Sequence, residues 1–327
     1  MTLTWTNWPL VLCVLLTAST VAQEPTFRAQ SNVVTVPALV KDGKGDIVYG
    51  LQVQDFIIED DGAVQEARLD EAADSEPISV VLVLQVGRRA FREFPRIRGL
   101  SAMLNPIFSQ PRSQVALVEF DSETNLVQEF TNQESSIDEQ VEHPRSGDGG
   151  AAILDAVQYS VRLLAHSPEG HRRVMLLISE TRDHGSHVGR IQDVVAEIGN
   201  SNVVVYALPF SPSLSQVMDT ERGSNKDEWG AGPDLLAPLL MASQAVRKNT
   251  PKAIAGMTGG EYEMFASRRS FEKLMTQFTN HLQSRYMLSF QPRNPHPGLH
   301  EIRVRLREPE GRTILARSGY WAEGERQ

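Results

Sequence analysis

The spacing of hydrophobic and polar residues divides this chain into regions with different predicted secondary structure. Between residue 23 and about 75, short apolar runs alternate with turn-forming residues, and no helical period appears. Residues 33–36 and 38–40 are rich in Val and Leu, which favours β-structure. Residues 56–59 run into Asp60-Asp61-Gly62, a pattern typical of a tight β-hairpin. We therefore expect residues 23–75 to form β-strands.

Residues 76–284 alternate between predicted strands and predicted helices. Four nearly continuous apolar runs indicate strands buried on both faces, and they are residues 78–84, 115–120, 174–178 and 203–208. A shorter run, residues 126–130, is expected to pair with the second of them as a hairpin. Apolar residues recur at helical spacing in residues 153–164, 191–198 and 271–282. This order predicts an α/β fold with a doubly wound, mostly parallel sheet and helices on both faces.

Residues 285–327 are again predicted to form β-strands, with apolar runs at 286–290, 301–306 and 313–317. In the middle run Ile302, Val304 and Leu306 alternate with Arg residues, which places one face of that strand in a core. Each end of the chain is too short to hold a core of its own. We therefore expect residues 23–75 and 285–327 to form one β-sandwich that flanks the α/β domain.

The first 22 residues read as a signal peptide. They contain no Asp, Glu, Lys or Arg, and the apolar stretch Pro9 to Leu16 is followed by small residues and then by polar sequence from Gln23. We expect the protein to be exported, either to the periplasm or out of the cell. The alternative is an uncleaved segment that anchors the chain to a membrane, although the apolar stretch is short for a bilayer span.

Charge and cysteine content narrow the classes of partner and chemistry. The formal net charge of -9 argues against a nucleic-acid partner, because phosphate binding needs concentrated Lys and Arg. The Arg residues between 88 and 98 are expected to lie on a solvated helix face. Cys13 is the only cysteine, so cleavage of residues 1–22 would leave no thiol, no disulfide and no Cys-ligated metal.

Four segments stand in an order that is fairly specific as a set. They are residues 33–69 with Glu59-Asp60-Asp61-Gly62, then Thr258-Gly259-Gly260, then Tyr286-Met287-Leu288-Ser289-Phe290, and last Ala316-Arg317-Ser318-Gly319-Tyr320-Trp321. In this order the chain resembles the von Willebrand factor A family, and within it the bacterial exported "VWFA-related" proteins of acidobacterial type. The resemblance covers nearly the whole chain after residue 22.

Domains of this family are known for a metal-ion-dependent adhesion site, in which Asp, Ser and Thr oxygens hold Mg²⁺ at the C-terminal edge of the sheet. The resemblance places Gln85, Gly87 and Arg89 at the Asp-x-Ser-x-Ser positions, Ala151 at the Thr position and Glu180 at the later Asp position. Only Glu180 keeps a carboxylate, whereas Gln85 could lend a carbonyl oxygen. Arg89 would repel a cation. The resemblance therefore implies a degenerate adhesion site with no metal and no cofactor.

The vacated metal position suggests a role for the two neighbouring guanidinium groups. We expect Arg88 or Arg89 to occupy or neighbour this position and to pair with Glu180. The alternative is that both side chains point into solvent, which is the usual place for Arg.

Two other sets of residues could carry chemistry. Glu180, Asp183, His184 and His187 could bind Zn²⁺ and support a metal-dependent enzyme, or they could form a polar loop with an Asp–His contact. Residues 147–150, Gly-Asp-Gly-Gly, could receive an anion at a helix N-terminus. Because this segment lacks the ending of a phosphate-binding loop, a turn that lets backbone approach backbone is the favoured interpretation.

A polar insertion at about residues 211–235 follows the predicted strand 203–208 and should emerge at the same edge of the sheet. It is either functional or an unstructured insertion, and Trp229 could anchor a partner.

We expect a non-enzymatic, metal-independent module that binds or scaffolds a protein partner. The candidate binding residues are Arg88, Arg89, Glu180, Asp183, His184 and Trp229. The alternative is a structural protein of envelope assembly in which the α/β domain is a spacer.

Overall fold

A computed structural model describes Met1 and residues 33–70, 76–187, 191–210, 237–293 and 295–323, without the side chains of Arg88, Arg89 and Ala237. The predicted signal peptide after Met1 and the whole predicted insertion, with Trp229, lie outside these residues. From Val33 onward the described residues belong to one compact unit. No helix in the described part is long and apolar enough to cross a membrane.

The centre of the fold is a five-stranded sheet in the order β7-β6-β5-β8-β9. Its strands are β5 (Ile78–Gln85), β6 (Gln114–Phe120), β7 (Thr124–Thr131), β8 (Arg172–Ile178) and β9 (Val203–Ala207). β6, β5, β8 and β9 run parallel, and β7 pairs antiparallel with β6. All eight residues of β5 are buried, as its apolar run predicts. The expected mostly parallel sheet and its hairpin are confirmed.

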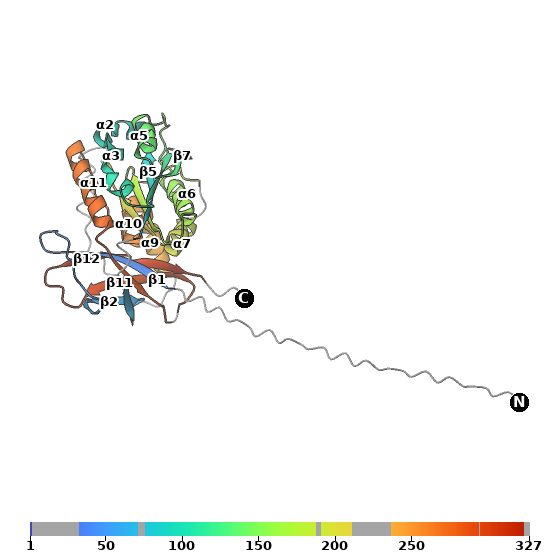
Figure 1. Cartoon of the computed structure of the whole chain (residues 1–327), viewed down its shortest axis with the longest axis vertical. Coiled ribbons are helices and arrows are strands. Elements are labelled where there is room, and N and C mark those ends of the chain that lie inside the picture. The colour runs from blue at the N-terminus through green and yellow to red at the C-terminus, as the bar shows by residue number, and fades with distance from the viewer. Residues whose placement is uncertain (2–32, 71–75, 188–190, 211–236, 294, 324–327) are drawn as a thin grey trace. The chain divides into compact units, whose positions relative to one another are not determined.

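Helices cover both faces of this sheet (Figure 1). One face carries α6 (Ile153–Ala165), α7 (Ile191–Asn200), α9 (Ala237–Lys248) and α10 (Thr250–Thr258), and the other carries α5 (Glu134–Glu142) and α11 (Arg268–Leu282). Successive residues of β5 divide between the two cores, because side chains of a strand alternate in direction. Leu82 and Leu84 pack with α11, whereas Val81 and Val83 pack with α6.

The segment between β5 and β6 forms four short helices rather than one continuous basic face. They are α1 (Arg88–Phe91), α2 (Phe94–Ile97), α3 (Leu100–Met103) and α4 (Asn105–Phe108). Pro95 and Pro106 stand at helix starts, and Gly99 adopts a φ of 76° between two helices. Because proline cannot continue a preceding helix and a left-handed residue ends one, the sequence breaks the segment into single turns.

Helices α9 and α10 are not predicted from the hydrophobic pattern of the chain, although α10 carries clear end signals. The Asn249 side chain accepts the Lys252 N–H at the start of α10, and Gly259 adopts a φ of 77° at its end. A Cβ on Gly260 would lie 1.9 Å from the Val205 carbonyl oxygen, so the chain passes directly against β9. It then forms parallel bridges from Tyr262 to Ala207 and from Phe265 to Phe210.

Two four-stranded antiparallel sheets pack below the α/β layers as a sandwich (Figure 1). One has the order β12-β1-β10-β4, and the other has the order β13-β11-β2-β3. Their strands from the N-terminal part are β1 (Val34–Lys41), β2 (Phe56–Asp60), β3 (Ala63–Gln65) and β4 (Ala67–Asp70), with a short 3-10 helix η1 (Val53–Asp55) before β2. Those from the C-terminal part are β10 (Tyr286–Phe290), β11 (Gly298–Leu306), β12 (Thr313–Ala316) and β13 (Gly319–Ala322). Each sheet mixes strands from both ends of the chain, as expected from their size.

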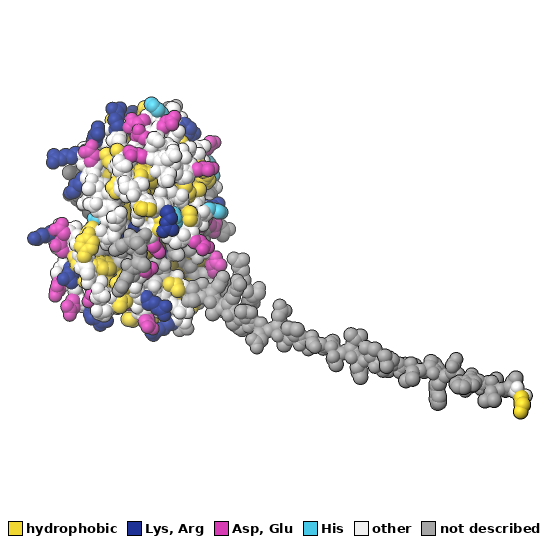
Figure 2. All heavy atoms as spheres, in the orientation of Figure 1, with side chains coloured by type: hydrophobic (Ala, Val, Ile, Leu, Met, Phe, Trp, Pro, Cys, Tyr) yellow, Lys and Arg dark blue, Asp and Glu magenta, His cyan; other side chains and the backbone are white. Residues whose placement is uncertain are grey.

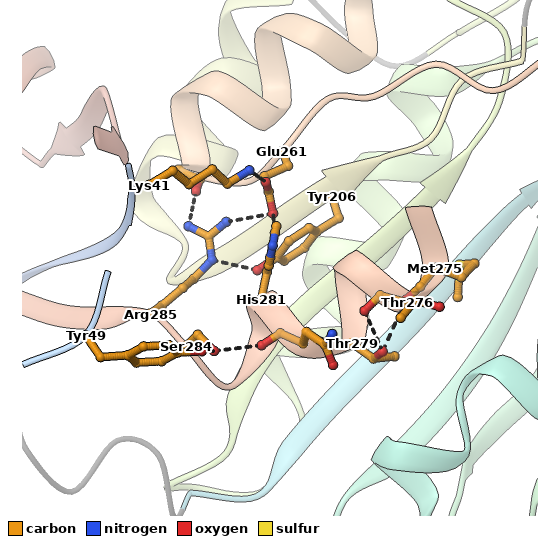
Figure 3. A network of polar contacts seen from close by, with 12 residues as sticks. Lys41, Tyr49, Tyr206, Glu261, Met275, Thr276, Thr279, His281, Ser284 and Arg285 are labelled. Carbon is orange, nitrogen blue, oxygen red and sulfur yellow. Dashed lines mark hydrogen bonds and ion pairs between the residues drawn. The ribbon is translucent and has the colours of Figure 1, made fainter. Parts of the chain in front are cut away.

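A buried ionic network joins the sandwich to the α/β layers (Figure 3). Lys41 at the end of β1 and His281 in α11 each lie 2.7 Å from a carboxylate oxygen of Glu261. Arg285 Nη2 lies 3.7 Å from Glu261, and its Nε donates to the Tyr206 hydroxyl of β9 at 2.6 Å. Burial alone would raise the pKa of Glu261, but the His281 hydrogen bond, the Arg285 charge and the Lys41 hydrogen bond lower it to about 2.

Candidate functional site

The residues at the adhesion-site positions meet at the C-terminal edge of the central sheet. Gln85 ends β5, Glu180 follows β8 and Ala151 precedes α6. Because the parallel strands all end at this edge, residues far apart in the sequence lie side by side there. Gln85 is 1% exposed and Glu180 is 4% exposed, so both polar side chains are buried and need hydrogen-bond partners.

Gln85 and Glu180 are hydrogen-bond partners of each other. The Gln85 Nε2 donates to Glu180 Oε1 at 3.0 Å, and the Gln85 Oε1 accepts the backbone N–H of Glu180 at 2.8 Å. The His184 Nε2 lies 2.7 Å from the same Glu180 Oε1. The Gln85 carbonyl oxygen, which could lend itself to a metal, uses one of its two acceptor positions for the backbone N–H of Glu180 in this arrangement.

The glycine-rich segment 147–150 lies against the residues that follow β5, and its Gly150 carbonyl oxygen is 3.5 Å from Gln85 Nε2. A Cβ on Gly87 would stand 2.9 Å from the carbonyl oxygens of both Asp148 and Gly150. A Cβ on Gly147 would stand 2.7 Å from the Val86 carbonyl oxygen, and one on Gly150 would stand 2.1 Å from the Ser122 hydroxyl. These positions accept only glycine without movement of the backbone. The interpretation of residues 147–150 as a turn that lets backbone approach backbone is confirmed.

Two aspartates that the sequence analysis did not single out hold this turn in place. Asp121 follows β6 and is 4% exposed, and its carboxylate accepts the N–H groups of Glu123 at 2.9 Å and Asp148 at 3.0 Å. Asp148 in turn accepts the N–H of Gly150 at 2.7 Å, and hydrogen bonds from Gly150 and Ser122 lower the pKa of Asp148. The position of Asp121 at a strand end and of Asp148 between glycines is the signal that could have identified them.

The loop after β8 closes the other side of the site. Ala151 and His184 exchange two backbone hydrogen bonds of 2.9 Å. Asp183 accepts the Leu154 N–H at the start of α6 and the Ser186 hydroxyl, at 2.9 and 2.5 Å. Asp183 therefore stabilises a helix start, and the side chain of His184 pairs with Glu180.

The structure does not gather the proposed zinc ligands of this loop into one group. Glu180 and His184 are in contact, but Asp183 is held at α6, and the exposed His187 is placed by its backbone N–H, which donates to Asp155 at 2.8 Å. Among the described residues, the group of three ligating side chains that could hold a metal lies elsewhere, at Asp61, His296 and His300. The side chains of Arg88 and Arg89 lie outside the described part, and so does Trp229.

The fold and this edge define an α/β domain of the kind that binds its ligands at the carboxyl ends of parallel strands. Residues 91–228 match the family model of the von Willebrand factor type A domain, and the chain contains a domain of this family. The match begins after β5 and therefore leaves out Gln85, Gly87 and Arg89. Among curated proteins, none matches the chain.

Three solved structures of bacterial proteins are similar to this chain. BatB, a conserved hypothetical protein from Bacteroides thetaiotaomicron, is 14% identical over 63% of this chain and 98% of its own, with a TM-score of 0.39. An aerotolerance-related membrane protein from Bacteroides fragilis is 16% identical over 62% of this chain and 98% of its own, with a TM-score of 0.40. The von Willebrand factor domain of the pilus tip protein Mfa5 from Porphyromonas gingivalis is 14% identical over 33% of this chain, with a TM-score of 0.30. This chain covers 39% of that pilus protein's chain.

Proposed function

We propose that this chain is an exported, non-enzymatic protein that binds a protein partner at the C-terminal edge of its central sheet without a metal ion. The observation that carries the proposal is the closed state of the adhesion-site position. Gln85, Glu180 and His184 hydrogen bond to one another there, and residues 147–150 lie against the residues that follow β5.

A hard cation at this position would find too few oxygen ligands. Mg²⁺ favours six oxygens in octahedral geometry at about 2.0–2.1 Å. Glu180 supplies the carboxylate of the family's later Asp position, but one of its oxygens already contacts both Gln85 and His184. Gly87 and Ala151 carry no side-chain oxygen, and Gly87 could not gain one without a collision with Asp148 and Gly150. The chemistry of this donor set supports binding without a metal.

The same contacts argue for binding rather than catalysis. Glu180 and His184 could act as an acid–base pair, but Glu180 is buried beneath its own loop. A cavity of about 310 Å³ lies at the opposite end of β8, lined by residues that include Arg172, Tyr206 and Arg285. This cavity lies away from the Glu180–His184 pair.

A protein partner suits the surface charge of the molecule. On the face shown in Figure 2, acidic and basic side chains lie interspersed, and the chain carries a net charge of -9. Nucleic acid would require a concentrated basic surface. We call the C-terminal edge of the central sheet, with Gln85, residues 147–151 and residues 180–187, the binding edge. Its exposed residues include Arg182, His187 and Asp148, which supply both signs of charge and a polar rim.

Photo-crosslinking in the cells that produce the protein tests this proposal. A photoreactive amino acid would replace Arg182 or His187 at the binding edge, and Glu169 at the opposite end of the α/β domain as a matched exposed control. We expect the same partner to be captured from both edge positions, with or without EDTA, and not from Glu169. Capture at Glu169 alone would show that the α/β domain is a spacer, and capture that EDTA abolishes would show a metal-dependent interaction.

A further inference from the structure

The β-sandwich holds a second polar cluster, which the proposed function does not use. Asp60 ends β2, and Asp61 is the first residue of the hairpin turn that leads to β3. His296 precedes β11, and His300 lies within β11, where the strand pairs with β13. The pairing of Ile302 with Asp60 brings the two histidines to the hairpin, although about 235 residues of sequence separate them from it.

The side-chain atoms of this cluster converge on one carboxylate oxygen. Asp61 Oδ2 lies 3.0 Å from His296 Nε2 and 2.8 Å from His300 Nδ1. Asp60 Oδ1 lies 3.2 Å from the same His300 nitrogen. One ligand atom from each of Asp61, His296 and His300 can be chosen so that all lie within 4.8 Å of one another.

Contacts around the cluster fix the direction of each ligand atom. The His300 Nε2 lies 2.7 Å from the His296 carbonyl oxygen, so this nitrogen donates and Nδ1 is directed to the carboxylates. Asp61 Oδ1 accepts the Glu301 N–H at 2.9 Å, which leaves its Oδ2 for the histidines. The Tyr320 hydroxyl donates to Asp60 at 3.1 Å. A histidine whose second nitrogen donates to a backbone carbonyl is the arrangement that orients metal-bound imidazoles.

We propose that Asp61, His296 and His300 bind one divalent transition-metal cation of the Zn²⁺ class. Two imidazole nitrogens and one carboxylate oxygen form a ligand set that Zn²⁺ prefers, with Asp60 or water as the fourth ligand. A hard cation such as Mg²⁺ would prefer a site made of oxygens.

Charge and burial support a cation here. His300 is 1% exposed and lies against two carboxylates. The two carboxylates give this position a negative potential, which attracts a divalent cation. The two imidazole rings stack with centroids 4.0 Å apart, so the exposed-side ring of His296 must turn out of the stack for its Nε2 to face the same ion as His300.

The site would tie the two ends of the chain together, because Asp61 comes from the N-terminal strands and both histidines come from the C-terminal ones. A metal ion that binds only the folded chain stabilises the folded state, so the bound ion would raise the free energy of unfolding. This role is separate from the binding edge, which lies in the α/β domain.

Titration of the untagged, chelator-treated protein with Zn²⁺ and Co²⁺ tests this proposal. We expect one metal ion per chain by calorimetry, and visible absorption of tetrahedral Co²⁺. His296→Ala and Asp61→Asn should each weaken Zn²⁺ binding by about tenfold or more. Both variants keep the fold, because the His300 bond is to the His296 backbone and Asn accepts the left-handed φ of 47° at position 61.

His143→Ala and His184→Ala are the matched controls. His143 is an exposed histidine after α5, and His184 belongs to the binding edge. Both variants should bind Zn²⁺ as the parent protein does. The proposal is overturned if no stoichiometric binding occurs, or if His296→Ala and Asp61→Asn bind Zn²⁺ with the parent affinity. Loss of binding in His184→Ala would place the metal at the other edge.

Discussion

At the scale of single residues, close packing of the backbone characterises the position where the resemblance would place an adhesion-site Ser. A family motif would have Ser at position 87, but the carbonyl oxygens of Asp148 and Gly150 leave no room for a Cβ there. Two backbone segments are therefore in tight contact at this position. The Gln85–Glu180 pair fills the space beneath that contact.

Gly87→Ser tests this packing. The new side chain must push residues 147–150 away, and overpacking of this kind costs about 1–3 kcal/mol of unfolding free energy. Gly149→Ser is the matched control, because a Cβ on Gly149 meets nothing within 4 Å. Urea unfolding should show a lower midpoint for Gly87→Ser and a change of less than about 0.5 kcal/mol for Gly149→Ser. Equal stability of the two variants would show that the turn does not close on Gly87.

At the scale of elements, the stability of the sandwich depends on the contacts that join it to the α/β layers. The Glu261 carboxylate contacts Lys41 of β1, His281 of α11 and Arg285, which lies just before β10. Its folded-state pKa of about 2 lies below its ordinary value of 4.5. The unfolded chain therefore binds the proton more readily, so this carboxylate stabilises the fold above pH 4.5 and loses its contribution as the pH falls toward 2.

Glu261→Gln should remove this pH dependence. At pH 7 we expect the variant to lose up to ~3 kcal/mol of unfolding free energy, because a buried ionic partner is lost. Between pH 4.5 and pH 2 the parent protein should lose stability more steeply than the variant. Urea unfolding across this range measures both effects. Parallel pH profiles for the two proteins would contradict the role of Glu261.

The elements themselves differ in how far the sequence predicts them. The strands of the central sheet were predictable, because burial on both faces leaves an unbroken apolar run such as that of β5. The single-turn helices α1 to α4 were not, because their helical pattern is interrupted at Pro95, Gly99 and Pro106. α9 and α10 were missed although Asn249 and Gly259 mark the ends of α10.

The sites were less predictable than the fold because their contacts join distant segments. The sequence indicated which residues stand at the adhesion-site positions, but not that Gln85 would pair with Glu180, 95 residues away. Asp61 appeared only as part of a hairpin signal, and His296 and His300 had no local pattern to distinguish them. Strand pairing between the two chain ends creates their proximity, and that pairing is visible only in three dimensions.

At the scale of the whole molecule, the two ends of the described chain build one sandwich under a von Willebrand factor type A domain. The arrangement leaves the C-terminal edge of the α/β sheet at the far end from the sandwich (Figure 1). The proposed metal site strengthens the sandwich, whereas the proposed partner binds at the opposite edge. The central claim is that this edge works without a metal.

Thermal unfolding with Mg²⁺ and Mn²⁺ tests that claim most directly. The His296→Ala variant is the right background, because it removes the proposed transition-metal site in the sandwich. A cation at a hundred times its dissociation constant would add about 2.7 kcal/mol of stability and raise the melting temperature by a few degrees. We predict no shift at millimolar concentrations of either cation. A clear shift that Glu180→Gln abolishes would show that the edge binds a metal ion and would contradict the account.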